Sequence, residues 1–232
     1  METSFFTFFM VLSVYFLLKE EKSQVKFPLS SLLIATTALI RPEGFLLMGL
    51  SLGYKVFQWR MTGSNCPREL LWWSLPLAII LLPYLWWKVS YYGSLLPNSF
   101  YYKKSWGNGG DYILNFFYSF WLYILMALHF LWREWKSCRG TDDKDAGENK
   151  QHFYSLIYLG LTIFVVLIPT FSINPVMGDH FRFLIPALPF IFVLCGGWLN
   201  QHRSYWTTRK MTALFVLVLL VAYSLYSYPS TK

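Results

Sequence analysis

The residues that could carry chemistry fall into three short stretches, and the first is Arg41-Pro42-Glu43-Gly44, which lies between two apolar segments. It places two opposite charges beside a proline, which donates no backbone hydrogen bond, and a glycine, which tolerates unusual dihedral angles. Charges near membrane depth are costly and generally face a partner or an aqueous cavity. Two interpretations follow: a helix break that presents Arg41 and Glu43 to a polar site, or an interfacial turn whose two charges neutralise each other.

The second stretch is MGDHFRFLIPALPF, residues 177–190, which gathers Asp179, His180 and Arg182 into four positions. A carboxylate, an imidazole and a guanidinium that cluster where the chain enters an apolar segment can handle protons or bind phosphate. The alternative is an ion pair between Asp179 and Arg182 at the start of a helix. At a surface such a pair contributes at most about 1 kcal/mol.

The third stretch is YYGSLLPNSFYYKK, residues 91–104, in which Tyr92, Asn98, Tyr101 and Lys103 interrupt the apolar character of the chain. Aromatic rings stack on the C–H faces of sugars, and cations meet phosphate oxygens, so the mixture suits a sugar and phosphate site. Tyrosine is also common in the aromatic belt of a membrane protein. Site and belt both remain open on chemical grounds.

The elements that must position these residues are membrane helices. The chain of 232 residues is 55% hydrophobic, 21% aromatic and only 14% charged, with a mean hydropathy of +0.38. A helix needs about 20 apolar residues to cross a bilayer, and no alternation of period two indicates a barrel. The apolar runs are residues 3–18, 27–57 in two halves, 70–90, 112–132, 153–171, 183–199 and 211–228.

The sequence therefore predicts an all-α, polytopic transmembrane helix bundle with about eight membrane segments, including a broken pair around Arg41–Gly44. Residues 1–232 are expected to form a single transmembrane domain. If both halves of the run 27–57 cross or re-enter the membrane, the loops rich in Lys and Arg fall on one side, which is then cytoplasmic. These loops are residues 19–26, 58–69, 133–151 and 200–210.

The same assignment places the three chemically unusual stretches and the N-terminal Glu2 on the outer face. The net charge of +8 is then explained by topology and by anionic lipid at the inner leaflet. No nucleic-acid partner is needed, and membrane lipids are the expected surroundings. The start of the chain lacks the cationic region and the cleavage site of a signal peptide, so the first apolar run is expected to be retained.

Cysteine and metal patterns are uninformative. Cys66 and Cys138 lie in predicted cytoplasmic loops and Cys195 lies in a helix, so no disulfide is indicated. No zinc spacing is present, and the acidic residues 141–149 do not follow the calcium-loop pattern. No cofactor is evident; a divalent cation is compatible with acidic residues beside phosphate, but no ligand set is visible.

Four motifs occur in order: METSFF at the start, LIRPEGFLL, YYGSLLPNSFYYKK and GDHFRFLIPALPF. Together they resemble the membrane region of the GT-C class of integral-membrane glycosyltransferases, especially the bacterial arabinofuranosyltransferase-like and mannosyltransferase-like members. The resemblance covers about three quarters of the chain. No single motif is decisive, and the resemblance depends on four motifs in order, separated by apolar helices.

The resemblance implies sugar transfer from a polyprenyl-phosphate donor to a hydroxyl of a glycan, lipid or protein acceptor, at the outer face of a bacterial cell membrane, by a single inverting displacement. It implies three groups of site residues. These are Arg41, Lys103, His180 and Arg182 for the donor phosphate; Asp179 and Glu43 as catalytic carboxylates that orient hydroxyls; and Glu2, Tyr92, Asn98 and Tyr101 for the sugar or acceptor.

Two departures from the family pattern matter. In the relatives an outer loop with the acidic residue taken as the catalytic base precedes the Met-Glu-Thr motif, which here begins the chain. We therefore expect the chain to be the C-terminal part of a longer transferase membrane region that lacks the main base, and whether it is active alone stays open. The spacing between Asp179 and Arg182 is also tighter than in many relatives.

Two other classes compete with the transferase. Broken helices such as the one at residues 41–44 occur in transporters, so a transporter or lipid flippase is the alternative. Against it, no second interrupted segment is visible, and the charges gather at one face. A non-catalytic membrane scaffold is the third possibility.

Overall fold

The computed structural model describes residues 2–22, 27–62, 67–93, 109–140, 146–172 and 183–201. These residues form helices. Seven are α-helices, and a short 3-10 helix, η2, leads into the last of them. The elements are α1 (Glu2–Lys22), α2 (Leu29–Ile40), α3 (Glu43–Thr62), α4 (Pro67–Tyr92), α6 (Gly109–Gly140), α7 (Ala146–Ser172), η2 (Ile185–Ala187) and α8 (Leu188–Gln201).

The all-α prediction is confirmed, but the number of about eight membrane segments is wrong for the described residues. Four helices there are long and apolar enough to cross a membrane: α1, α4, α6 and α7. This is consistent with a multi-pass membrane protein. The predicted run 211–228 lies outside the described residues.

The described residues contain fewer membrane-spanning helices than predicted for local reasons. Helix α2 has 12 residues, about 18 Å at 1.5 Å per residue, whereas the hydrocarbon core is about 30 Å thick. Helix α3 has 20 residues, but Glu43, Lys55 and Arg60 lower its hydropathy. The run 183–199 begins with a 3-10 turn because prolines stand at its start, and this leaves α8 with 14 residues.

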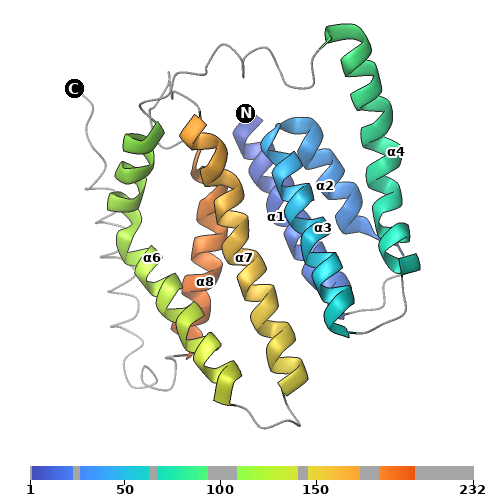
Figure 1. Cartoon of the computed structure of the whole chain (residues 1–232). Coiled ribbons are helices and arrows are strands. Elements are labelled where there is room, and N and C mark those ends of the chain that lie inside the picture. The colour runs from blue at the N-terminus through green and yellow to red at the C-terminus, as the bar shows by residue number, and fades with distance from the viewer. Residues whose placement is uncertain are drawn as a thin grey trace, which may run out of the picture.

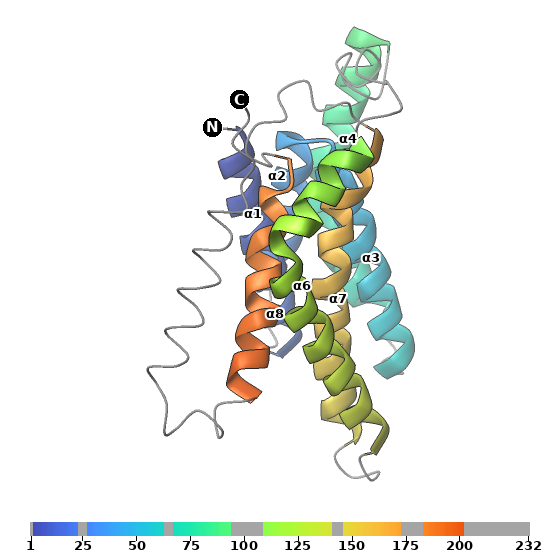
Figure 2. The same ribbon diagram turned by 90° about the vertical axis from the view of Figure 1, so that its left-hand side faces the viewer.

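The helices run roughly along one direction and divide into two neighbouring groups (Figure 1). Helices α1, α2 and α3 pack together on one side, and α6, α7 and α8 on the other. Helix α7 joins the groups because it contacts α3 as well as α6 and α8, and η2 lies against both α1 and α7. Helix α4 packs against α2 at the edge of the bundle (Figures 1 and 2).

Helix α2 is buried over most of its length, whereas α1 and α4 each bury one face. On α1 the fully buried side chains Phe6, Met10, Val14 and Leu17 follow the helical repeat. The opposite faces remain apolar, which a helix surface in water would not be. On α4 the large apolar residues Leu71, Trp72, Leu75, Ile79, Leu82 and Trp86 are all exposed. An apolar surface of this extent is expected where lipid tails, and not water, surround the helices.

The directions of the helices place the ends that flank the Lys- and Arg-rich loops at one end of the bundle, as the sequence predicted. The start of α1, the α2–α3 turn, the end of α4, the start of α6, the end of α7 and the start of α8 lie at one end of the bundle (Figure 1). We call this the Arg41 end. The opposite end, where α1, α3, α6 and α8 finish, bears the basic side chains Lys19, Arg60, Arg68, Arg133, Lys136, Arg139 and Lys150.

Candidate functional site

The break between α2 and α3 follows directly from its sequence. Arg41 has extended dihedral angles (φ −144°, ψ 146°), as expected of a residue before proline, and this ends α2. The Gly44 amide then donates to the Arg41 carbonyl at 2.9 Å, and the Phe45 amide donates to the Pro42 carbonyl at 3.1 Å. These bonds start α3 in the opposite direction, so Arg41 and Glu43 are held at a tight helix–helix corner.

Glycine is required at this corner because the two helices touch there. A Cβ atom on Gly44 would lie 2.5 Å from the backbone nitrogen and Cα of Ala38 in α2. Only a residue without a side chain allows the first turn of α3 to approach the last turns of α2 this closely. The motif Arg-Pro-Glu-Gly is thus explained position by position: Pro42 breaks the helix, Gly44 permits the contact, and the two charged residues flank the turn.

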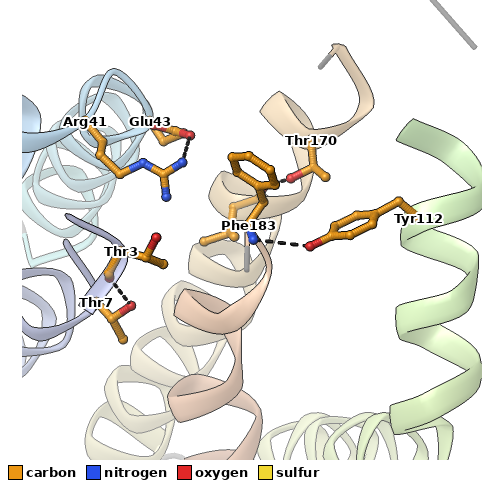
Figure 3. A network of polar contacts seen from close by, with 8 residues as sticks. Thr3, Thr7, Arg41, Glu43, Tyr112, Thr170 and Phe183 are labelled. Atoms are coloured by element: carbon orange, nitrogen blue, oxygen red, sulfur yellow. Dashed lines mark hydrogen bonds and ion pairs between the residues drawn. The ribbon is translucent and has the colours of Figure 1, made fainter. Parts of the chain in front are cut away.

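Arg41 and Glu43 form an ion pair with 3.0 Å between Nη2 and Oε1, and their side chains are only 13% and 11% exposed. Two aromatic rings complete the surroundings of the guanidinium. Its carbon lies 5.2 Å from the ring centre of Phe6 in α1 and 5.6 Å from that of Phe183. Rings at these distances attract a cation and shield it from water, so Arg41 is fixed in one place. Figure 3 shows the ion pair and the Phe183 side chain.

The second carboxylate oxygen of Glu43 is unusual. Atom Oε2 is buried and has no hydrogen-bond partner among the described residues. Most buried polar atoms in folded proteins are hydrogen-bonded, and an unsatisfied acceptor is costly. Glu43 therefore offers one oxygen to Arg41 and keeps another that can accept a hydrogen bond from a hydroxyl group or from water.

Sequence reasoning missed the residues that surround the pair. Tyr112, at the start of α6, accepts a hydrogen bond through its hydroxyl oxygen from the Phe183 amide at 3.2 Å. It thereby fixes the residue that follows the predicted Asp179–Arg182 cluster. Thr3 and Thr170 lie around the same region from α1 and α7 (Figure 3). Phe183 could have been predicted as a site residue because it follows Arg182 directly in the sequence. Nothing in the sequence distinguishes Tyr112 from the other tyrosines, of which the chain has 16 in total.

The other predicted site residues divide into two groups. Glu2 and Tyr92 lie at the Arg41 end, and both are exposed. Tyr92 is in ring contact with Trp87 and Tyr91 of its own helix, which suits an aromatic belt better than a site shared with Arg41. The remaining predictions lie outside the described residues: Asn98, Tyr101, Lys103, Asp179, His180 and Arg182.

These six residues belong to two segments that the structure does not describe. The described residues on either side of each segment lie at the Arg41 end. Segment 94–108 is flanked by the end of α4 and the start of α6, and segment 173–182 is flanked by the end of α7 and Phe183. Both segments are thus attached to the bundle at the end that holds the Arg41–Glu43 pair.

No group of three or more His, Cys, Asp and Glu side chains suited to a metal ion is present within the described ranges. The divalent cation that the sequence left open stays a prediction. Comparison with known proteins finds no protein family, no curated protein and no solved structure that matches this chain.

Proposed function

We propose that this chain belongs to a glycosyltransferase of the GT-C type. It would transfer a sugar from a polyprenyl-phosphate donor to a glycan, lipid or protein acceptor at the outer face of a bacterial cell membrane. The observation that carries the proposal is the Arg41–Glu43 pair: a cation held beside two rings, and a carboxylate with one oxygen that has no hydrogen-bond partner among the described residues. The four-motif resemblance supplies the reaction class.

The pair suits the two charge problems of the reaction. In an inverting displacement the acceptor oxygen attacks the anomeric carbon, the bond from that carbon to the phosphate oxygen breaks, and the phosphate leaves with the electron pair. A fixed guanidinium stabilises the charge that grows on the phosphate, and it does so without reorganising. A carboxylate oxygen such as Glu43 Oε2 can orient a sugar hydroxyl or accept its proton.

The remaining roles come from the undescribed segments and from the lipid-facing helices. Lys103, His180 and Arg182 would add cationic contacts to the phosphate, and Asp179 a second carboxylate. The exposed apolar faces, such as that of α4, suit the polyprenyl tail.

A lipid flippase or transporter is the alternative, and the broken α2–α3 pair is the observation that favours it. In transporters, however, broken helices meet a substrate near the middle of the membrane. Here the break lies at one end of the bundle (Figure 1), where a site for membrane-surface chemistry is better placed. Ion-driven uptake or lipid flipping by reconstituted vesicles, without sugar transfer, would select this alternative.

The test is sugar transfer from radiolabelled polyprenyl-phosphate sugars in membranes that contain the full native protein. Arg41→Gln should lower transfer by about 10²- to 10³-fold, the usual cost of removing one donor to a developing negative charge. Arg41→Lys should recover only part of it, because an ammonium group does not reproduce a planar guanidinium. Arg182→Ala should abolish transfer while membrane insertion is kept.

Lys88→Gln is the matched control. Lys88 is also a cation over a ring, 5.6 Å from the centre of Tyr84, but it lies on α4 and outside the Arg41–Glu43 pair. Its variant should transfer sugar at the normal rate. Normal transfer by Arg41→Gln would refute the assignment of Arg41, and normal transfer by Arg182→Ala would refute that of Arg182.

A further inference from the structure

The last turns of α6 bear a surface that the proposed function does not use. Trp132, Trp135, Lys136 and Arg139 are spaced at positions i, i+3, i+4 and i+7, so they lie on one face of the helix. All four are exposed, with Trp132 53% and Trp135 41% accessible. We call these four residues the α6 stripe.

Each cation of the α6 stripe lies over an indole ring. Lys136 Nζ is 5.8 Å from the ring centre of Trp132, and the guanidinium carbon of Arg139 is 4.0 Å from that of Trp135. These contacts gather two positive charges on the same surface as two amphipathic rings. The stripe therefore combines the two residue types that favour the boundary between hydrocarbon and headgroups.

Glu134, the carboxylate nearest to Lys136 in sequence, does not neutralise the charge of Lys136. Glu134 faces the neighbouring helices: it accepts a hydrogen bond from Gln201 of α8, and it lies 3.8 Å from Nδ1 of His152 in α7. Lys136 and Arg139 take part in none of the ion pairs found among the described residues. Among the described residues, no carboxylate therefore competes with an external anion for the positive charge of the stripe.

The length of α6 fixes the depth of the stripe. Its candidate span, Gly110–Arg139, has 30 residues, or about 45 Å along a helix that is kinked at Phe120, while the hydrocarbon core is about 30 Å thick and the bilayer with its headgroups about 40–45 Å. A helix of this length that crosses the core places its last turns among the headgroups. The stripe follows the apolar part directly and lies at the basic end of the bundle (Figure 1).

We propose that the α6 stripe binds an anionic phospholipid. Lys136 and Arg139 would contact the phosphate oxygens, and the rings of Trp132 and Trp135 would lie between the headgroup and the first methylene groups. Cations are attracted to the anionic leaflet, and tryptophan favours this depth. The inference does not depend on the proposed sugar transfer.

The experiment measures the thermal unfolding of the full chain in a neutral detergent, with phosphatidylglycerol, phosphatidylcholine or inorganic phosphate added at equal concentration. Phosphatidylglycerol should raise the midpoint temperature more than phosphatidylcholine does, and inorganic phosphate should not reproduce the rise. The double variant Lys136→Gln/Arg139→Gln should lose more than half of the difference between the two lipids. Lys88→Gln, which removes a ring-stacked cation on α4, should keep it.

The proposal would be overturned by equal effects of the two lipids on the native chain, by an unchanged difference in the double variant, or by a rise produced by inorganic phosphate alone. If the double variant does not fold, the comparison of the two lipids on the native chain still tests the proposal. Added salt screens the contact between the cations and the headgroup, so the difference between the lipids must shrink as salt rises. A difference that does not change with salt also overturns the proposal.

Discussion

At the scale of single residues, Gly44 is the position where the fold tolerates least change. The atoms that a Cβ would meet belong to the backbone of Thr37 and Ala38, and they cannot rotate away. Gly44→Ala should therefore separate α2 from α3 and lower the free energy of unfolding by about 1–3 kcal/mol, the usual cost of overpacking. Unfolding in mixed detergent micelles, followed by circular dichroism, measures the loss.

Gly49 provides the control within the same helix. No atom lies within 4 Å of a Cβ built there, and alanine is the better helix former by about 0.5–1 kcal/mol. Gly49→Ala should leave stability unchanged or slightly raised. Equal effects of the two substitutions would show that the contact between α2 and α3 at Gly44 is not tight.

At the scale of elements, Glu21 joins three helices near the basic end. Its Oε2 atom accepts a hydrogen bond from the Tyr54 hydroxyl of α3 at 2.9 Å. Its Oε1 atom accepts from Gln58 of α3, and from Gln151 of α7 at 3.1 Å. Because α1 and α7 belong to different helix groups, this single carboxylate connects the two halves of the bundle.

Glu21→Ala should lower the free energy of unfolding by about 1–3 kcal/mol, because the nearly buried Tyr54 hydroxyl loses its charged acceptor. The same unfolding assay applies. Glu69→Ala is the control, since Glu69 is exposed in the first turn of α4 and should cost less. A larger loss for Glu69→Ala than for Glu21→Ala would contradict the joining role.

A second inter-helix carboxylate explains how the short α2 begins. Pro28 provides no side-chain cap, but Glu20 of α1 accepts a hydrogen bond from the Ser30 amide at 2.8 Å. It satisfies one of the amides that a helix start leaves unpaired, and its charge suits the positive end of the helix dipole. Trp73 of α4 then donates to the Ser30 hydroxyl at 2.8 Å. The start of α2 thus depends on two other helices.

At the scale of the whole molecule, the two ends of the bundle should face opposite sides of the membrane, with the Arg41 end outside. Ser90 and Ser137 are exposed near the ends of α4 and α6, at opposite ends of the bundle. In a chain whose three cysteines are replaced by alanine, an impermeant maleimide should label Ser90→Cys from outside and Ser137→Cys only after permeabilisation. Labelling of Ser99→Cys only from the cytoplasm would invert the arrangement.

The sequence by itself determined the helical class and the position of the helix break. Both are local consequences: apolar runs in lipid must satisfy their backbone groups as helices, and Arg41-Pro42 cannot continue one. The charge bias of the loops also predicted which helix ends lie together. The number of crossings did not follow, because the start of α2 is set by Glu20 of another helix, and the 3-10 turn before α8 shortened a run that composition alone made long enough.

Only the tertiary structure decided what surrounds Arg41. The ion pair with Glu43 joins residues two positions apart and was visible in the motif, but the rings of Phe6 and Phe183 come from α1 and the approach to α8. The Tyr112 bond that holds Phe183 comes from α6. Sequence patterns report which residues a helix can present, whereas such contacts depend on how helices far apart in the chain pack against one another.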